Sequence, residues 1–447
     1  MTRRPADPAP AGTLTLAAVG DLYLGAALRG EQHPAFLEAM DLLRAADVRL
    51  GNLECLLLDD DVPGAAEAPG AWAGAPASLG TELRWLGMDV LSTANNHAGD
   101  YGDAGLASTW KALRRLGIAH AGTGPDLAAA RQPAYLDTPA GRLAVVAASS
   151  SYLPAARAGR PGVGLPGRPG VAPLRFGTAY RLDATAFDAL QRIAAQLPAQ
   201  AQGRHRERAL ARDYSREHGA ADADRLSFFG AEFIRSDGHG TLSWPAPDDL
   251  QDLEDSVRQA RKQADFVVAC LHSHEYDSDP RQPAAFAVAA CRRAIEAGAD
   301  AVVGHGEHGI RAVETWQGRP IFYGIGAFVF QPYQYPRQPA DFLEAYAMRD
   351  ATLAQAYQTR RERAGFFQRP DDWEALLLRL SLRRHGPPSF EIHPVTLWPS
   401  GHDTPSGVPH LARAADGIAL LAKVQACSRQ HGTRLQLDEQ ACVLRGP

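Results

Sequence analysis

FVVACLHSHE at residues 266–275 and AVVGHGEHG at residues 301–309 each run from apolar residues straight into histidines and a glutamate. Short apolar, β-branched runs of this kind are typical of strands buried on both faces, as in parallel sheets. Residues 284–297 between them have apolar residues at helical spacing. The strand–helix–strand order predicts an α/β fold, with polar side chains gathered where the strands end.

The same rhythm begins near the N-terminus and returns after an interruption. We expect a late hairpin from residues 376–382 and 390–397, a terminal helix over 410–431 and a short strand after it. Asp249 is a plausible helix N-cap. The other predicted strands are 13–19, 48–53, 90–93, 118–121, 143–149 and 321–330, and the other predicted helices are 34–46, 79–86, 103–116 and 250–264.

The chain divides into a disordered tail, one large domain and a C-terminal segment. Residues 1–12 are rich in Pro and Ala and form the predicted tail. Residues 13–398 form the predicted catalytic domain, and residues 399–447 form a linker, a helix and a short strand that pack on it. The alternation breaks over 151–245, which we interpret as an inserted helical and loop segment and a possible lid. Its charged stretch, 184–222, is predicted to be a solvated helix face.

Bulk composition excludes several classes of protein. The 447 residues carry a net charge of −5, so no overall positive field favours nucleic acid or an anionic membrane. No apolar run reaches the 18 residues of a membrane-spanning helix, and the N-terminus lacks the apolar core of a signal peptide. The five cysteines have no CxxC spacing, which argues against a disulfide framework. We therefore expect a cytoplasmic protein without a membrane anchor, of undetermined oligomeric state.

Ligand-type residues follow predicted strands five times. Taken singly, each has a structural explanation, because Asp can cap a helix, Asn can form a turn and His can be buried in a core. Five such coincidences are much harder to explain in this way, because strand carboxyl ends converge on one edge where sites form. The five are Gly20-Asp21, Asn52-Leu53-Glu54, Asn95-Asn96-His97, His272-Ser273-His274-Glu275, and His305 with His308.

This mixture of imidazole, carboxylate and carboxamide groups is a nitrogen and oxygen ligand set. It suits divalent Mn, Mg, Zn or Fe and needs no thiolate. Six or seven such groups are more than one tetrahedral metal site uses, which indicates a second ion. We therefore expect one or two metal ions, and the two ions of a pair would lie roughly 3.5–4 Å apart.

The motifs GDLYLG, GNLE, TANNHAGDYGDAG, HSHEY, GADAVVGHGEHG and IFYGIGAFVF, over roughly residues 14–148 and 260–330, carry a family resemblance. Together they resemble the CapA-type proteins of capsule and poly-γ-glutamate synthesis, relatives of the calcineurin-like metallophosphoesterases. The segment LPGRPGVAPLR looks like a stretch of a longer, soluble subgroup. The resemblance implies a sandwich of two β-sheets flanked by helices.

The resemblance also implies roles by matching position. His97 resembles the neighbouring acid/base or transition-state donor. Tyr23 and Asn52 stand where the phosphoesterase pattern has stronger metal ligands. In our interpretation, His274 or Glu275 compensates for these weaker ligands. His274 and Glu275 are therefore further catalytic candidates. The implied metal ligands are Asp21, Glu54, Asn96, His272, His305 and His308.

Three further residues are candidates for binding an anionic substrate. Arg168 and Arg175 lie in the insertion, and guanidinium groups bind carboxylates and phosphates through two points. The alternative is that both are surface charges of a loop. Asn95 is the third candidate, and it could instead be a turn residue.

Three functions fit these residues. The first is a metal-dependent hydrolase of a phosphoester or of a peptide or amide bond, in capsule or poly-γ-glutamate metabolism. The second is a metal-dependent peptide epimerase that moves a Cα proton in peptide natural-product biosynthesis. Some CapA-like proteins resemble such epimerases. The third is a non-catalytic accessory protein of capsule assembly. The partner in the first two is an anionic small molecule or peptide.

Overall fold

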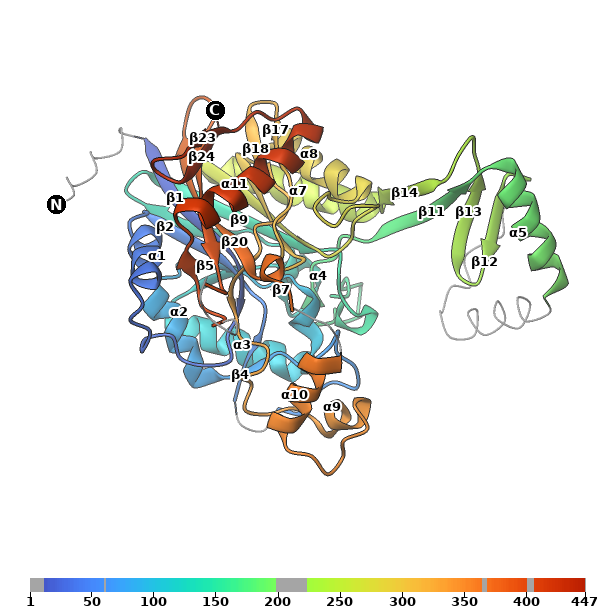
Figure 1. The fold of residues 1–447 in the computed structure, drawn as a ribbon, viewed down its shortest axis with the longest axis horizontal. Coiled ribbons are helices and arrows are strands. Elements are labelled where there is room, and N and C mark those ends of the chain that lie inside the picture. The colour runs from blue at the N-terminus through green and yellow to red at the C-terminus, as the bar shows by residue number, and fades with distance from the viewer. Residues whose placement is uncertain (1–11, 60–61, 198–222, 364–367, 400–405, 447) are drawn as a thin grey trace.

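The computed structural model describes residues 12–59, 62–197, 223–363, 368–399 and 406–446. A large sheet has the strand order β23-β24-β21-β20-β1-β2-β5-β6, with β19 beside β1 and β22 beside β21 (Figure 1). Around β1 the neighbours β2 and β19 are parallel, whereas β20 is antiparallel. Its strands are β1 Thr13–Tyr23, β2 Val48–Leu53, β5 Val90–Ser92, β6 Ala119–Ala121, β19 Ala327–Phe330, β20 Glu374–Arg383, β21 Ser389–Thr396, β22 His410–Leu411, β23 Gln436–Asp438 and β24 Val443–Gly446.

A second sheet has the order β17-β18-β16-β15-β9-β8. The strands β9, β15, β16 and β18 run parallel to their neighbours, and the outer strands β8 and β17 are antiparallel. The bounds are β8 Ala134–Thr138, β9 Gly141–Ser149, β15 Phe266–Ser273, β16 Ala301–Gly306, β17 Val313–Trp316 and β18 Arg319–Phe322.

Strand β15 is buried on both faces. Phe266, Val268 and Cys270 belong to the hydrophobic cluster that also contains the core of β1 and β20. The alternate residues Val267 and Ala269 belong to a second cluster, with α7 (Pro247–Gln263) and α8 (Ala285–Ala297). The two large sheets therefore share one core, and helices cover the outer face of the second sheet. This confirms an α/β fold, and the closer likeness to a metallophosphoesterase sandwich stays a prediction.

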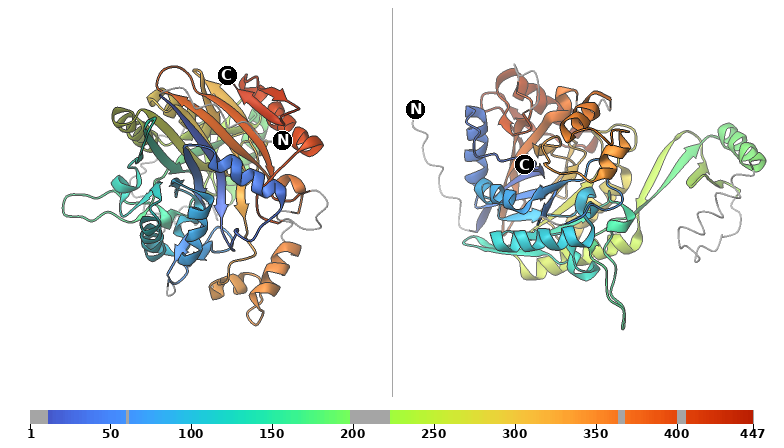
Figure 2. Two further views of the ribbon diagram at one scale, coloured as in Figure 1. Left: turned by 90° about the vertical axis from the view of Figure 1, so that its left-hand side faces the viewer. Right: turned by 90° about the horizontal axis from the view of Figure 1, so that it is seen from below.

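The remaining elements lie around these sheets (Figure 2). The helices are α1 Pro34–Arg44, α2 Thr81–Leu86, α3 Gly102–Leu116, α4 Leu127–Ala130, α9 Ala340–Ala345, α10 Leu353–Arg363 and α11 Ala414–Ser428. Two small sheets pair β3 Leu56–Leu58 with β4 Gly74–Pro76, and β7 Thr123–Gly124 with β10 Gly170–Val171. In the described part of the chain, no helix is long and apolar enough to cross a bilayer.

The insertion forms an arm that projects from the body (Figure 1). Its sheet has the order β12-β13-β11-β14. The expected helix over 184–222 is confirmed only for α5, and residues 198–222 lie outside the described part. More of the described arm is strand than helix, and the lid role stays a prediction. The arm consists of β11 Phe176–Leu182, α5 Ala184–Gln196, β12 Arg225–Phe228, β13 Ala231–Arg235 and β14 Gly240–Pro245.

The structure corrects several local expectations. The predicted strand 321–330 is two strands in different sheets, β18 and β19. The first strand runs to Tyr23, so Asp21 lies within it. Ala246 rather than Asp249 caps α7, because Pro247 takes the first helical position. The C-terminal segment does more than pack on the domain: β24 pairs with β21 and so extends the large sheet. The predicted hairpin of β20 and β21 is confirmed.

Candidate metal centre

The predicted ligands meet where the two large sheets meet. Asp21 in β1 is in register with Asn52 in β2, and His272 in β15 is in register with His305 in β16. Parallel neighbours place their last residues side by side. All four side chains are buried, because each strand end faces the other sheet and not the solvent.

Asn52 links the two sheets. Its Nδ2 donates to Asp21 Oδ1 at 2.8 Å and lies 3.4 Å from His272 Nδ1. The side chain is fully buried, so these contacts fix its orientation. Asn52 thus acts as a hydrogen-bond donor to the carboxylate of Asp21.

Three histidines point their ring nitrogens at one another. His272 Nδ1 lies 3.0 Å from His305 Nδ1, and His272 Nε2 lies 3.2 Å from His274 Nε2. Burial, with His274 and His305 nearby, lowers the pKa of His272 well below its ordinary value. Burial, with His308 nearby, lowers the pKa of His274 to about 3, and burial lowers that of His305 to about 4. Neutral imidazoles with converging nitrogens are the form that binds a cation.

The fourth histidine closes the group from a strained turn. His308 has a φ of 57°, in the left-handed region that non-glycine residues rarely adopt. This conformation brings His308 Nδ1 to 3.1 Å from Asp21 Oδ2 and 3.6 Å from Glu54 Oε2. A backbone outlier of this kind is typical of functional sites.

Asp21 and Glu54 respond to burial in opposite ways. Burial raises the pKa of Asp21, but the hydrogen bond and charge of His308 outweigh it, and the pKa is lowered overall. Burial and the neighbouring Asp21 carboxylate raise the pKa of Glu54 well above its ordinary value. Two buried carboxylates this close resist being charged together, and a bound cation would relieve that repulsion.

Buried atoms without a hydrogen-bond partner test whether a metal fits. Among the described residues, Glu54 Oε1, Glu54 Oε2 and His305 Nε2 are such atoms. An unsatisfied buried polar group costs roughly 1–3 kcal/mol, more if charged, so three together need an explanation. Divalent metal ions would supply it, because carboxylate oxygens and imidazole nitrogens are their ligands.

The donor atoms form three overlapping groups, each with its atoms within 4.8 Å of one another. Asp21 belongs to two groups and His272 to two, so the geometry can accept one ion or a pair. Asn96 Oδ1 lies 3.1 Å from His272 Nε2, beside these groups. The groups are Asp21 with His272 and His305, Glu54 with His272 and His274, and Asp21 with Glu54 and His308.

His97 is held in place by Asp100. The two lie on the short 3₁₀ helix Asn96–Gly99 and at its C-cap, and His97 Nδ1 is 2.6 Å from Asp100 Oδ2. Asp100 also accepts a hydrogen bond from the Ala73 backbone at 2.7 Å. Burial raises the pKa of Asp100, and His97 opposes that rise. The ring of Tyr23 packs edge-on against His97 at 5.3 Å, so Tyr23 serves as a wall of the site.

Asn95 supports this turn. Its Nδ2 donates to the Leu53 carbonyl at 2.7 Å, and its Oδ1 accepts from the His97 backbone at 3.2 Å. Asn95 does not line the cavity described below, among the residues that the structure describes. Asn95 therefore positions the backbone of His97, and its contact with substrate stays a prediction.

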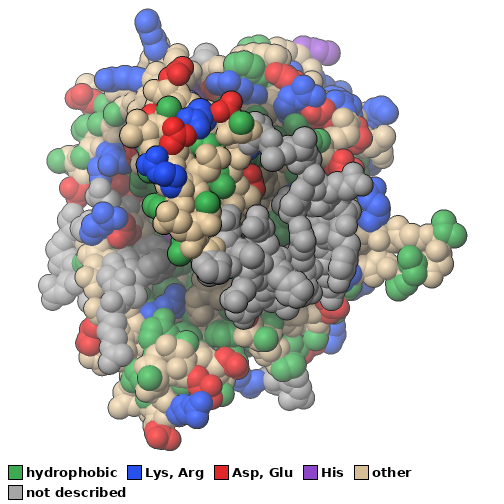
Figure 3. Space-filling model, turned by 90° about the vertical axis from the view of Figure 1, so that its right-hand side faces the viewer, with side chains coloured by type: hydrophobic (Ala, Val, Ile, Leu, Met, Phe, Trp, Pro, Cys, Tyr) green, Lys and Arg blue, Asp and Glu red, His purple; other side chains and the backbone are tan. Residues whose placement is uncertain are grey.

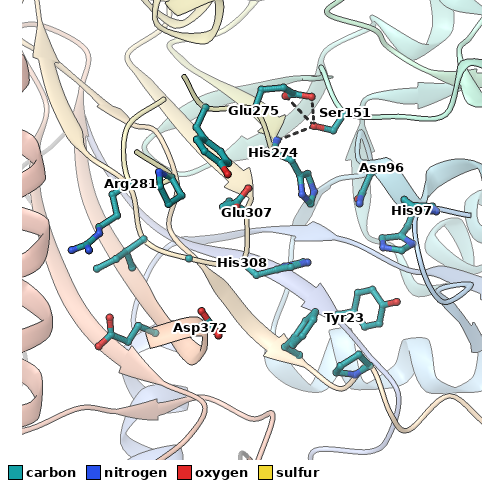
Figure 4. Close-up of a pocket in the computed structure, with 18 of the residues that line it drawn as sticks. Tyr23, Asn96, His97, Ser151, His274, Glu275, Arg281, Glu307, His308 and Asp372 are labelled. Carbon is teal, nitrogen blue, oxygen red and sulfur yellow. Dashed lines mark hydrogen bonds between the residues drawn. The ribbon is translucent and has the colours of Figure 1, made fainter. Parts of the chain in front are cut away.

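Glu275 is held by hydroxyl groups. Its carboxylate accepts from Ser150 Oγ at 2.7 Å, from Ser151 Oγ at 3.0 Å and from Ser273 Oγ at 2.9 Å. Ser151 also accepts a hydrogen bond from the His274 backbone at 2.8 Å (Figure 4). Glu275 is absent from the three ligand groups among the described residues, and it lines the cavity beside His274.

A cavity of about 900 Å³ opens onto this centre (Figure 4). His97, His274, Glu275 and His308 line it, together with Asn96. Four basic side chains, Arg281, Arg360, Arg369 and Lys423, also line it, and so do four acidic ones, Glu275, Glu307, Asp372 and Glu374. Arg369 pairs with Asp372 and Lys423 with Glu374, which leaves Arg281 as the basic side chain best placed to contact an anionic ligand.

The two arginines chosen from the sequence lie elsewhere. Arg168 donates to the Arg157 carbonyl at 3.1 and 2.9 Å. Arg175 makes a two-point contact with Asp249 of α7 at 2.7 and 2.9 Å. Neither residue is among those lining the cavity. Their role in binding substrate stays a prediction, and the structure places both away from this cavity. The sequence did not show this, because a Gly/Pro-rich loop does not reveal which way it faces.

Two further residues, which were not predicted from the sequence, hold parts of this site in place. Asp100 could have been found from its i+3 spacing after His97 in the NNHAGD segment. Arg311 is 1% exposed and donates to the carbonyls of Ser273 and His274 at 3.1 and 2.9 Å, so it fixes the loop that carries His274. No local pattern identifies Arg311, because its partners lie far away in the sequence.

Comparison with known proteins places the chain in a family. Residues 15–332 match the family described as "Bacterial capsule synthesis protein PGA_cap". The chain belongs to this family. An uncharacterized protein of Sinorhizobium fredii, y4uA, is 31% identical over 96% of this chain and 93% of its own length.

Two relatives in Bacillus carry more informative names. The "PGA biosynthesis protein CapA" of Bacillus subtilis is 42% identical over 17% of this chain and 19% of its own length. The "Capsule biosynthesis protein CapA" of Bacillus anthracis is 22% identical over 75% of this chain and 64% of its own length. The resemblance to CapA-type proteins is thereby confirmed.

Proposed function

We propose that this protein is a metal-dependent hydrolase that cleaves a phosphoester or a peptide or amide bond in an anionic substrate of capsule- or poly-γ-glutamate-related metabolism. The observation that carries the proposal is the convergence of Asp21, Glu54 and the histidines around buried atoms that lack partners. The names of the CapA relatives support the metabolic setting.

The residues divide into ligands and proton carriers. One or two divalent ions, of Mn, Mg, Zn or Fe, would be held by Asp21, Glu54, Asn96, His272, His305 and His308, with His274 in reach of the same centre. Such an ion supplies Lewis acidity, which polarises a phosphoryl or carbonyl oxygen and activates water.

His97 protonates the leaving group in this proposal. Asp100 holds the Nδ1 side of the ring, so Nε2 is the nitrogen left to exchange a proton with substrate. The basic side chains of the cavity, among them Arg281, bind the anionic part of the substrate.

The test compares the metal-reloaded protein with two variants. Phosphate release from p-nitrophenyl phosphate and amine release from a γ-glutamyl peptide would be measured after stripping with a chelator and adding one metal at a time. We expect turnover that requires metal and that falls in His97→Gln and in Asp21→Asn. Metal-independent turnover would contradict the proposal. Metal binding without turnover of either substrate class would favour the accessory role in capsule assembly.

One observation favours a second function. His97 and His274 line the same cavity from different elements, one after β5 and one after β15. Two proton carriers around one substrate are what a peptide epimerase needs to remove and return a Cα proton. Deuterium incorporated from solvent at one Cα without cleavage would establish this activity in place of hydrolysis.

A further inference from the structure

A groove of about 290 Å³ continues the cavity onto the base of the arm. The two spaces share His274, Glu275 and Tyr276 as lining residues. The other lining residues come from β11, β14, the loop after β15 and the start of α8: Phe176, Thr178, Tyr180, Thr241, Ser243, Asp277, Ala284 and Phe286.

One face of the β11–β14 ribbon forms a wall of this groove. Residues 176, 178 and 180 alternate along β11 and so share a face. Antiparallel pairing sets Thr178 opposite Ser243 and Tyr180 opposite Thr241, which puts the β14 residues on that same face. The ribbon is anchored beneath by Phe176, which stacks on Phe286 of α8 with ring centroids 4.1 Å apart.

Two aromatic rings stand exposed in the groove. Tyr180 is 43% exposed and Tyr276 is 47% exposed, whereas most large apolar side chains of the body are buried. Aromatic rings with a polar tip are favoured at binding surfaces. Figure 3 views the molecule from the side on which the arm projects, where acidic and basic side chains are interspersed around it.

The groove and the cavity differ in their basic side chains. The cavity has both signs of charge, with Arg369 paired to Asp372 and Lys423 paired to Glu374, and the guanidinium of Arg281 lines it. Among the described residues, the groove is lined by Glu275 and Asp277 and by no lysine or arginine. A polyanion along the groove would face two carboxylates and no cation, so the groove favours an uncharged chain, and a negative group finds a guanidinium only in the cavity.

We infer that the substrate is an extended peptide whose carboxylate enters the cavity while its preceding neutral, apolar or aromatic residues lie in the groove against Tyr180 and Tyr276. This assignment rests on the proposed function, because it takes the metal centre as the reacting end. It also distinguishes this chain from a protein that holds a poly-glutamate strand along its arm. Alternating side chains on a strand face suit an extended peptide, whose side chains alternate with the same period.

Affinity selection from a peptide library tests the inference. The probe is a mixture of N-acetylated hexapeptides with free carboxyl ends and randomised positions, offered to the full-length, metal-reloaded protein, and bound peptides are identified by mass spectrometry. We expect about tenfold enrichment of neutral, aromatic-containing peptides over peptides rich in Asp and Glu, since burial of one ring contributes on the order of 1.4 kcal/mol.

Matched variants locate the binding. Tyr180→Ser should remove most of the enrichment, whereas Ile193→Ser, which deletes an exposed apolar side chain on α5 outside the groove, should preserve it. No enrichment, enrichment of acidic peptides, or equal enrichment in Tyr180→Ser would overturn the inference. Tighter binding of a neutral hexasaccharide than of the selected peptides would also overturn it, in favour of a glycan.

The Asp21→Asn variant separates this inference from the proposed function. If Asp21→Asn binds no metal but still selects the same peptides, the groove binds peptide independently of the proposed metal centre. Loss of selection in Asp21→Asn together with full selection in Tyr180→Ser would support the metal centre while the groove fails.

Discussion

His97 Nδ1 lies 2.6 Å from Asp100 Oδ2, and the two side chains are buried beside the metal centre. Asp100 orients the imidazole and selects the tautomer with the proton on Nδ1, since a carboxylate can only accept. The pair comes from one short turn, three residues apart, so it is preformed before substrate arrives.

The first prediction concerns this pair. His97→Gln should lower kcat by about 10²–10⁴-fold, the usual contribution of a general acid. Asp100→Asn should lower kcat less, because the ring remains but its orientation and tautomer are no longer fixed. Metal analysis of both variants should give the parent's stoichiometry. Unchanged kcat in His97→Gln would remove His97 from the reaction.

The second prediction uses the raised pKa of Glu54. Burial and Asp21 raise this pKa in the folded, metal-free protein, so the folded state holds a proton that the unfolded state releases above the ordinary glutamate pKa. Stability of the metal-free protein therefore falls as pH rises from that ordinary value toward the raised one. Glu54→Gln carries no titrating group there and should escape this loss.

Thermal unfolding of the metal-free proteins at pH 5 and pH 8 measures the effect. The melting temperature of Glu54→Gln relative to the parent should increase from the lower to the higher pH. A difference that is the same at both values would mean that Glu54 is already charged at pH 5. With metal added, the parent should have the higher melting temperature, because only the parent has the Glu54 carboxylate to bind the metal.

Arg311 gives the third prediction. Its buried guanidinium donates to the carbonyls of Ser273, His274 and Pro280. Arg311→Met should leave these groups without donors and destabilise the fold by about 3 kcal/mol, with weaker metal binding at His274. Arg168→Met is the matched control, because Arg168 is exposed and donates to one carbonyl only. Denaturant unfolding and metal titration of both variants test this, and equal effects would contradict it.

The fourth prediction separates the cavity arginine from the loop arginines. Arg281 lines the cavity, and its side chain has no ion-pair partner among the described residues. Arg281→Ala should raise KM for an anionic substrate about tenfold with little change in kcat, as expected when uniform binding is lost. Arg175→Ala should leave KM unchanged, because Arg175 is committed to Asp249. Steady-state kinetics of the two variants measure these KM values. A raised KM in Arg175→Ala with an unchanged KM in Arg281→Ala would show that the loop arginine binds substrate.

Much of the fold followed from sequence because its strands are continuous apolar runs. β15 and β16 are recognisable from FVVACL and AVV alone, and the pairing of His272 with His305 follows from their places at parallel strand ends. The extension of the large sheet by β24 did not follow, because a short terminal strand carries little pattern and its partner β21 is distant in sequence.

The residues of the candidate site also differ in how far the sequence predicted them. Residues carried by strand ends, such as Asp21 and His305, were predictable, since topology brings strand ends together. Residues carried by loops were not, because loop direction depends on tertiary contacts. Arg175 turned toward α7 and Arg281 toward the cavity, although both are arginines in irregular, proline-containing segments.

The central claim is that buried histidines and carboxylates from two sheets hold divalent metal. The most direct test is the metal content of the full-length protein after chelator stripping, reloading and desalting, measured by inductively coupled plasma mass spectrometry. We expect one to two tightly bound ions per chain, and fewer in Asp21→Asn. Less than one ion per chain with every divalent metal offered would contradict it.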